Sequence, residues 1–267
     1  MPAPATIRRA STWQNFREGF FVRIEAFIDQ ANGRRAEHIS VRRMYNFGSA
    51  TRDPAVAVPH QQEVALAGVH IALTVPSPRI YPIATHALST ADEVMVHVPE
   101  TSGEVEIVLV QTDRLYVGVG SDHTDRALER TSILWSKQAC PNILAPVLWP
   151  WDEVKDRWDQ CVLRSWVDGR LYQDVSVSAF LSPPDILRIL HERVNDVPAR
   201  DFVLFGGTFV SVDKHLGFGA RWEIELDDPQ GGRKIRHGYD VINILDEVRD
   251  GFRVPVENPK PSGETKA

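Results

Sequence analysis

Three acidic residues and one lysine have a spacing that suggests metal chemistry. Residues 104–110 (EVEIVLV) begin with strict polar–apolar alternation, which predicts a β-strand because successive side chains leave a strand on opposite faces. Glu104 and Glu106 then share one face, and their carboxylates repel each other unless a positive charge lies between them. Asp122 and Lys137 follow downstream, so we predict a divalent cation bound by carboxylate oxygens.

Geometry allows two of these acids to reach a single ion. On a strand, Glu104 and Glu106 lie about 6.5–7 Å apart along the face, within reach of one octahedral Mg²⁺ or Mn²⁺, directly or through water. Asp122 follows a glycine-containing strand end whose backbone flexibility lets it approach the same ion. The alternative is that paired glutamates on an edge strand only aid solubility. The addition of Asp122 and Lys137 favours the metal site.

Composition narrows the class of protein. The chain has 267 residues, of which 43% are hydrophobic and 25% charged, with a net charge of −6, which is typical of a soluble globular protein and disfavours nucleic acid as a partner. Its two cysteines, Cys140 and Cys161, have no zinc-cluster spacing and fit a reducing compartment. No apolar run approaches the roughly 20 residues of a membrane helix, so we expect no membrane contact and a cytoplasmic location. No serine-hydrolase elbow or complete dinucleotide fingerprint occurs.

The pattern of elements predicts one mixed α+β, β-rich domain. We predict a hairpin around Asn32-Gly33, a turn or helix start at Asp53-Pro54, a second hairpin around residues 227–232, and further elements as follows. The strands are 93–98, 104–110, 115–119 and 202–205, and the helices are 59–67, 125–136 and 183–194. The expected organisation is an N-terminal lead-in with the hairpin (1–45), a catalytic domain (46–253) and a disordered tail (254–267).

Several short motifs occur in an order that resembles the fumarylacetoacetate hydrolase family, and more closely a little-characterised, DUF2848-like branch of it. The resemblance covers about residues 46–245 and includes a proline-rich loop, a Glu-x-Glu strand, a strand-end acid, a tryptophan–lysine stretch and a Gly-Thr turn. In this chain these motifs are Pro76-Ser77-Pro78, Glu104-Val105-Glu106, Ser121-Asp122-His123-Thr124-Asp125-Arg126, Trp135-Ser136-Lys137 and Phe205-Gly206-Gly207-Thr208. The resemblance implies a β-roll or sandwich with short peripheral helices, and a homodimer.

The resemblance also implies roles for individual residues. Glu104, Glu106 and Asp122 correspond to ligands of Mg²⁺ or Mn²⁺, and Lys137 to a cation that faces the substrate. Gly207 and Thr208 correspond to donors that bind a substrate carboxylate or keto oxygen.

His60 and Glu63 form the candidate general base. Positions i and i+3 share a helix face, so Glu63 can orient His60 and stabilise its charge. The family uses a His-x-x-Glu pair to activate water, although here Asn46-Phe47 stands well upstream of it. A solvated helix surface is the alternative for this pair. Arg52 is a further candidate, for binding a substrate carboxylate.

These residues predict a metal-dependent hydrolase that cleaves a C–C bond in a small 2-oxo or 1,3-dicarbonyl acid, such as an acylpyruvate or a fumarylacetoacetate-like compound. A metal that chelates a 2-oxo acid stabilises the enolate that develops during cleavage. Two alternatives stay open. The first is decarboxylation, hydration or isomerisation of a 2-oxo acid through the same enolate. The second is a noncatalytic binding protein that retains the fold.

Overall fold

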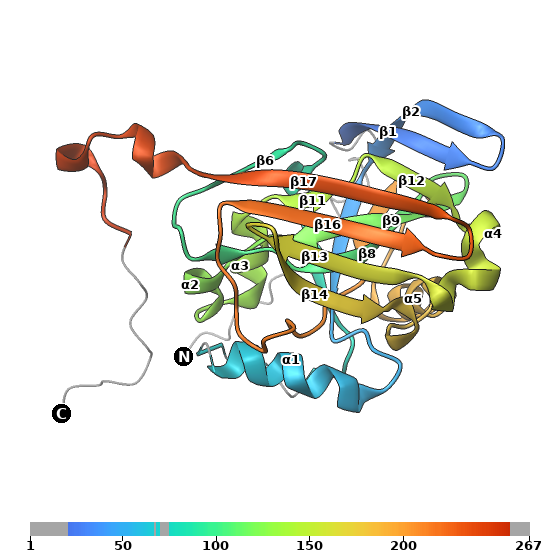
Figure 1. Cartoon of the computed structure of the whole chain (residues 1–267), viewed down its shortest axis with the longest axis horizontal. Coiled ribbons are helices and arrows are strands. Elements are labelled where there is room, and N and C mark those ends of the chain that lie inside the picture. Colours follow the sequence, from blue (N-terminus) through green and yellow to red (C-terminus); the bar gives the residue numbers. More distant parts are fainter. Residues whose placement is uncertain (1–20, 67, 70–74, 257–267) are drawn as a thin grey trace, which may run out of the picture.

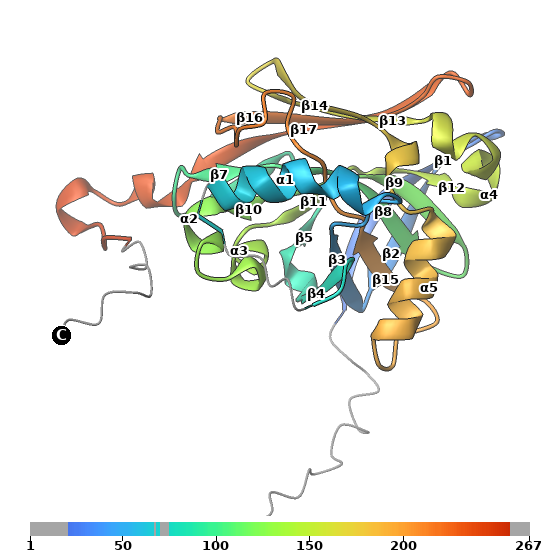
Figure 2. The same ribbon diagram turned by 90° about the horizontal axis from the view of Figure 1, so that it is seen from below.

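The computed structural model describes residues 21–66, 68–69 and 75–256, without the side chains of residues 56, 63 and 64. Residues 257–267 of the predicted tail, and residues 1–20 of the predicted lead-in, lie outside that range. Within it, the chain forms two large β-sheets with short helices at their margins (Figures 1 and 2).

The larger sheet has ten strands in the described chain. Its main path runs β2 (Gly33–Val41), β1 (Val22–Gln30), β12 (Val147–Pro150), β9 (Leu115–Asp122), β8 (Val105–Gln111), β15 (Phe202–Phe205), β3 (Arg43–Gly48) and β4 (Arg79–Ile83), with β11 (Asn142–Leu144) paired to β9 and to β5 (Leu88–Ser89). The predicted first hairpin is present, because Gln30 pairs with Gly33 across the Asn32-Gly33 turn. Since β1 also pairs with β12, the hairpin continues the main sheet.

The second sheet has five strands among the described residues. Their order is β14 (Arg170–Ser176), β13 (Val162–Val167), β16 (Arg221–Asp228), β17 (Arg233–Asn243) and β6 (Glu93–Val96). The predicted hairpin of β16 and β17 is confirmed. The hairpin of β13 and β14 was not predicted, although the sequence has an Asp-Gly pair, Asp168-Gly169, at its turn. Both residues have positive φ, the backbone conformation that such a pair favours in a two-residue turn. A separate two-stranded ladder joins β7 (Thr101–Ser102) to β10 (Thr124–Asp125).

Helices account for a smaller part of the described chain than strands do. They are α1 (Pro54–Leu66), α2 (Arg126–Glu129), α3 (Ile133–Ala139), α4 (Trp151–Val154) and α5 (Pro183–Arg193), with 3-10 turns at Thr85–Ala87, Lys155–Gln160, Val177–Ala179, Ile244–Glu247 and Asp250–Phe252. Helix α1 begins at Pro54, where a turn or helix start is predicted, and so extends five residues upstream of the helix predicted at 59–67. Asp53 caps it, accepting a hydrogen bond from the Ala55 amide at 2.9 Å. The single helix predicted at 125–136 is instead two, since Ser132 caps a new helix.

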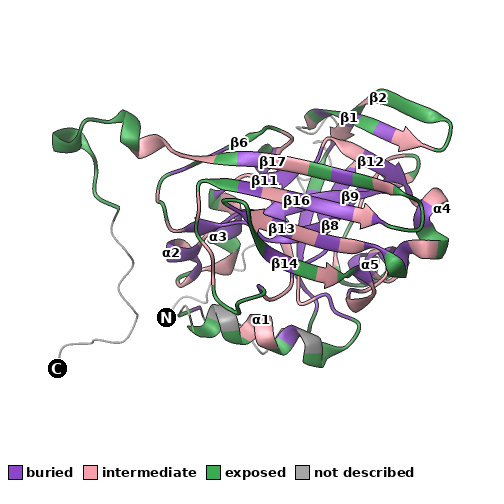
Figure 3. Cartoon of the chain, viewed as in Figure 1, coloured by how far each residue is buried: buried purple, intermediate pink, exposed green. Residues whose placement is uncertain are grey.

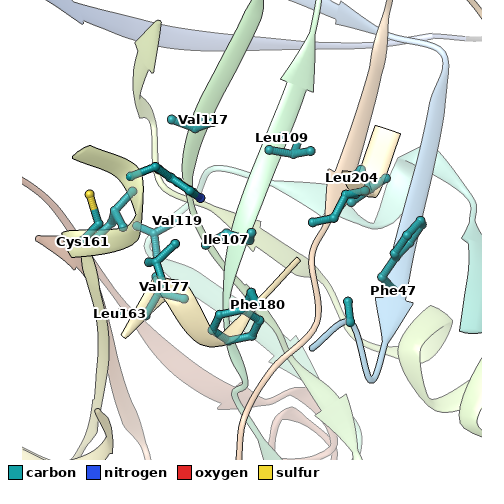
Figure 4. Close-up of a cluster of buried hydrophobic side chains, with 14 of the residues drawn as sticks. Phe47, Ile107, Leu109, Val117, Val119, Cys161, Leu163, Val177, Phe180 and Leu204 are labelled. Carbon is teal, nitrogen blue, oxygen red and sulfur yellow. The ribbon is translucent and has the colours of Figure 1, made fainter. Parts of the chain in front are cut away.

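Both faces of strand β8 are buried (Figure 3). On one face, Ile107 and Leu109 share a core with Leu163 of the five-stranded sheet (Figure 4). Ile224 of the same sheet belongs to this core as well. On the other face, Val108 and Val110 belong to a second core that the curling main sheet encloses. A strand covered on both sides reads as a continuous apolar run, which explains why residues 107–110 lose the alternation seen at 104–106.

Candidate metal centre

Glu104, Glu106 and Asp122 meet at one end of the main sheet. Glu104 directly precedes β8, Glu106 is the second residue of that strand, and Asp122 ends β9. Because β8 and β9 are antiparallel, with Val105 opposite Ser121, the start of one strand lies beside the end of the other. One carboxylate oxygen from each of the three acids lies within 4.8 Å of the others, and all three side chains are buried.

Lys137 is the nearest cation to this acid trio. It projects from α3, is itself buried, and forms an ion pair with Asp122 Oδ2. Its Nζ also lies 3.5 Å from Glu104 Oε2. Asp122 Oδ1 is buried and makes no hydrogen bond with the described residues. One oxygen of Asp122 is therefore committed to Lys137, and the other is open to a further cation.

Arg126 forms a second, fully buried ion cluster beside the trio. Its guanidinium donates to Glu104 Oε1 at 2.9 Å, to Glu129 Oε2 at 2.7 Å and to Ser102 Oγ at 2.6 Å. A guanidinium has several donors in a fixed plane, so it can satisfy two carboxylates at once. Arg126 thereby holds Glu104 through Oε1, whereas Lys137 lies next to Oε2. The i, i+3 spacing of Arg126 and Glu129 was the only signal for this cluster in the sequence.

The environment separates the protonation behaviour of the three acids. Burial, reinforced by the charge of Asp122, raises the pKa of Glu106 well above its usual value. Burial also raises the pKa of Asp122, against the opposing effect of Lys137. For Glu104, burial is outweighed by Arg126, Lys137 and His60, so its pKa is lowered. Burial opposes the charge of Lys137, but the carboxylates around it raise its pKa, so it stays an ammonium.

The buried donor set fits a divalent ion. Four carboxylates (Glu104, Glu106, Asp122, Glu129) and three cationic side chains (Arg79, Arg126, Lys137) are buried around the centre, a formal sum of −1. An oxygen-only ligand set of this kind suits Mg²⁺ or Mn²⁺ rather than soft metals. A bound divalent ion would change the sum to +1, which favours an anionic ligand beside it. Such an ion would also offset the repulsion that, together with burial, raises the pKa of Glu106.

A small cavity of about 60 Å³ opens onto Glu104 and Glu106. It is lined by Glu104 and Glu106 of the trio and by residues of β3, α1, β4, α2 and α3 and the segments beside them, namely Phe47, Gly48, Ser49, His60, Gln61, Arg79, Tyr81, Glu129, Ile133, Lys137 and Thr208. This volume suits a few waters or a small ligand fragment. Arg79 and Tyr81 were not among the predicted site residues, and they reach the cavity because β4 pairs with β3 at its edge.

A hydrogen-bonded chain lies behind the acids. Ser121 Oγ accepts from the Glu104 amide at 3.2 Å and lies 2.7 Å from the Tyr239 hydroxyl, which in turn lies 3.1 Å from His123 Nδ1. Burial and the nearby Arg126 lower the pKa of His123 to about 3, so its ring is neutral at physiological pH. His123 lies in the connection between β9 and β10 and links Tyr239 to Thr101 through its two ring nitrogens.

Comparison with models of protein families shows which family this chain belongs to. The sequence-family model described as "Protein of unknown function (DUF2848)" matches residues 48–239, which is more than half of the chain. The chain belongs to the DUF2848 family. No curated protein matches it by sequence.

Solved structures show what fold this DUF2848 protein has. It resembles a candidate fumarylpyruvate hydrolase from Burkholderia cenocepacia, with 17% identity, a TM-score of 0.56, and coverage of 83% of this chain and 95% of that one. It also resembles fumarylpyruvate hydrolase from Pseudomonas aeruginosa in complex with Mn²⁺ and pyruvate (15%, TM-score 0.53, 82% and 96% covered). A third likeness is 5-carboxymethyl-2-hydroxymuconate delta-isomerase from Mycobacterium smegmatis (14%, 0.53, 83% and 98%). The predicted β-rich, mixed α+β fold of the fumarylacetoacetate hydrolase type is confirmed.

The other predicted site residues of this DUF2848 protein differ in whether they reach the cavity. His60, on α1, lines the cavity, and its Nε2 lies 3.6 Å from Glu104 Oε1. Glu63 is on the same helix, but its side chain lies outside the described part of the structure. Arg52 does not line this cavity: its guanidinium bonds to Asp159 and to the Phe180 carbonyl oxygen at 2.8 Å.

Gly207 and Thr208 lie beside the acids in this DUF2848 protein, but their donors already have partners. The Gly207 amide donates to Glu106 Oε2 at 2.8 Å. The Thr208 hydroxyl donates to the Val105 carbonyl oxygen at 2.9 Å and accepts from Gln173. Both residues therefore support the strand that carries the acids.

Among the described residues, no helix is long and apolar enough to span a membrane.

Proposed function

We propose that this protein is a divalent-metal-dependent enzyme that cleaves a C–C bond in a small 2-oxo or 1,3-dicarbonyl acid by hydrolysis. The observation that carries the proposal is the trio of buried carboxylates paired with Lys137, beside a cavity that Glu104, Glu106 and Lys137 line. Buried acids repel one another in the absence of an ion, so such an arrangement lowers the stability of the fold. Groups of this kind are typical of functional sites. A bound Mg²⁺ or Mn²⁺ would supply an electron sink for the enolate of a 2-oxo acid.

Lys137 supports this chemistry through its charge. Because the surrounding carboxylates keep it protonated, its ammonium can stabilise an oxyanion that forms in the cavity. Its low exposure strengthens that interaction, since electrostatic effects are larger where water is excluded. Arg79 lines the same cavity, as does Tyr81. An anionic substrate would therefore enter a site with two cationic side chains, Arg79 and Lys137.

His60 is the proposed base that activates water in hydrolysis. It is the histidine that lines the cavity, and about 20% of its side chain is exposed, so it can exchange protons with solvent. Isomerisation is the second candidate reaction, because an isomerase is among the structures of similar fold, and decarboxylation would pass through the same type of enolate. These reactions use the same enolate but need no water activated by His60.

Adding Mn²⁺ or Mg²⁺ to metal-free protein should raise its melting temperature. A ligand that binds only the folded state stabilises it by about 2.7 kcal/mol when its concentration is 100 times its Kd. The measurement is thermal unfolding with and without the ion, together with isothermal titration calorimetry, and an excess of EDTA should reverse the shift. No binding at millimolar ion and an unchanged melting temperature would overturn the metal site.

A substrate screen should find metal-dependent turnover of at least one oxo acid. Acylpyruvates, oxaloacetate and ring-cleavage dioic acids are incubated with the protein and Mg²⁺ or Mn²⁺, and the products are identified by NMR. Two acids as products indicate hydrolysis, CO₂ release indicates decarboxylation, and an isomer of equal mass indicates isomerisation. Glu106→Ala serves as the blank. If metal binds but no oxo acid turns over, the noncatalytic alternative is favoured.

A further inference from the structure

The backbone ladder between β15 and β8 ends just before the acids. Phe205 lies opposite Val108, and the Gly206 amide makes the last rung with the Ile107 carbonyl oxygen at 2.9 Å. Gly207 then has φ +87°, which turns the chain away from β8. A Cβ on Gly207 would lie 2.9 Å from the Phe47 carbonyl oxygen, so glycine is required here. On the N-terminal side of Ile107, strand β8 has no strand neighbour along this edge among the described residues.

Two side chains take the place of the missing rungs. At Val105, between the two glutamates, the carbonyl oxygen accepts from Thr208 Oγ1 at 2.9 Å. The amide of Val105 donates to Gln173 Oε1 at 3.0 Å. If the register of β15 continued, Thr208 would lie opposite Val105, so these bonds occupy the position of the next backbone pair. The acids are thus held by a strand whose edge is closed by side chains.

Gln173 is the centre of this arrangement. It comes from β14 of the five-stranded sheet, is 2% exposed, and uses all four of its hydrogen-bonding positions. Oε1 accepts from the Val105 amide and from Ser165 Oγ at 2.9 Å, and Nε2 donates to Thr208 Oγ1 at 2.9 Å and to the Phe209 carbonyl oxygen at 2.7 Å. A backbone amide and a backbone carbonyl have fixed polarity, so they determine which end of the Gln173 amide faces which partner.

We infer that Gln173 is a positioning residue for the metal centre, an inference that rests on the proposed metal site. It fixes the backbone between Glu104 and Glu106 on one side. On the other side it fixes Thr208 and Phe209, which follow the Gly207 amide that binds Glu106 Oε2. Residues that orient metal ligands in this way affect metal affinity strongly. Gln173 is not among the described residues that line the cavity. The five-stranded sheet therefore contributes to the metal centre from outside the cavity.

The test measures the Mn²⁺ Kd of the full-length chain by isothermal titration calorimetry, at a temperature where circular dichroism shows folded protein. Gln173→Met removes all four hydrogen bonds at similar side-chain length. Gln173→Glu keeps the shape but loses the two donors. We expect each variant to bind Mn²⁺ about 10- to 100-fold more weakly than the unaltered chain. Gln111→Met is the matched control, because Gln111 lies at the opposite end of β8 and donates to the Thr112 carbonyl oxygen. Its Kd should not change.

The outcomes separate the two claims. If the unaltered chain binds no Mn²⁺, the proposed function fails. If it binds and both Gln173 variants bind equally well, even with a lower melting temperature, the positioning role is overturned and Gln173 is only structural. Where the Gln173 variants do not fold, Thr208→Val breaks the same bridge with little change in volume. An unchanged Kd in Thr208→Val then overturns the inference, and a 10- to 100-fold weaker Kd supports it.

Discussion

Replacing Glu106 with glutamine should abolish divalent-metal binding and, at the same time, make the metal-free protein harder to unfold. Burial and the charge of Asp122 raise the pKa of Glu106, so its ionised form destabilises the folded state at neutral pH. The amide has the same shape, removes that charge, and keeps an oxygen for the Gly207 amide. We expect Mn²⁺ affinity to fall more than about a hundredfold, and stability to rise by a margin of order 1 kcal/mol.

The gain in stability should depend on pH in a defined direction. The folded-state pKa of Glu106 lies above its unfolded value, so the destabilisation is complete above the folded pKa and disappears as the pH falls below the unfolded value near 4.5. Urea unfolding of metal-free protein at pH 8 and at pH 4.5 measures this difference.

Glu225 offers a matched control for this experiment. It is also buried, but it lies in the five-stranded sheet and pairs with Arg164 and Lys234. Glu225→Gln should lower stability and leave the metal Kd unchanged. If Glu106→Gln bound Mn²⁺ within tenfold of the unaltered chain, or if its metal-free form were less stable at pH 8, the assignment of Glu106 as a ligand would be wrong.

Replacing Arg126 with methionine should destabilise the protein by about 3–5 kcal/mol, because it leaves buried carboxylates without their cation. Arg126 is 1% exposed and bonds Glu104 and Glu129 simultaneously. Methionine fills much of the volume, so the loss reports charge rather than a cavity. Urea unfolding at pH 7 is the measurement.

Arg188 provides the comparison for Arg126. It pairs with Asp185 and Glu192 on the exposed face of α5, where more than half of the Arg188 side chain is accessible. Exposed pairs contribute about 0–1 kcal/mol, so Arg188→Met should change little. A loss below about 1 kcal/mol in Arg126→Met would mean that solvent or a counter-ion neutralises Glu104 and Glu129 instead.

Local patterns in the sequence predicted the part of the centre that lies on β8 and β9. Alternation at 104–106 places Glu104 and Glu106 on one face, and the short segment between Glu106 and Asp122 has room for a hairpin and little else. An antiparallel hairpin brings its outer ends together, so the proximity of these acids follows from the elements alone.

Contacts from distant parts of the chain determine the rest. Whether Glu106 is exposed or 1% accessible depends on the second sheet and the curled main sheet, which close both faces of β8. The bond between Gln173 and Val105 joins residues 68 positions apart, and no local pattern indicates it. Arg52 shows the converse, since a suitable residue type near the motif pairs with Asp159 instead.

The cavity has a fixed floor and an exchangeable rim. The floor is the end of β8, which two cores and the Gln173 bridge hold. The rim includes Ser49, Gln61 and Ile133, from the loop after β3 and from helices α1 and α3, and none of them bonds an acid of the trio. Substitutions at these three positions are therefore expected to change which ligands enter the cavity without displacing Glu104 or Glu106. A protein engineer could therefore vary the ligand selectivity of this cavity at its rim alone.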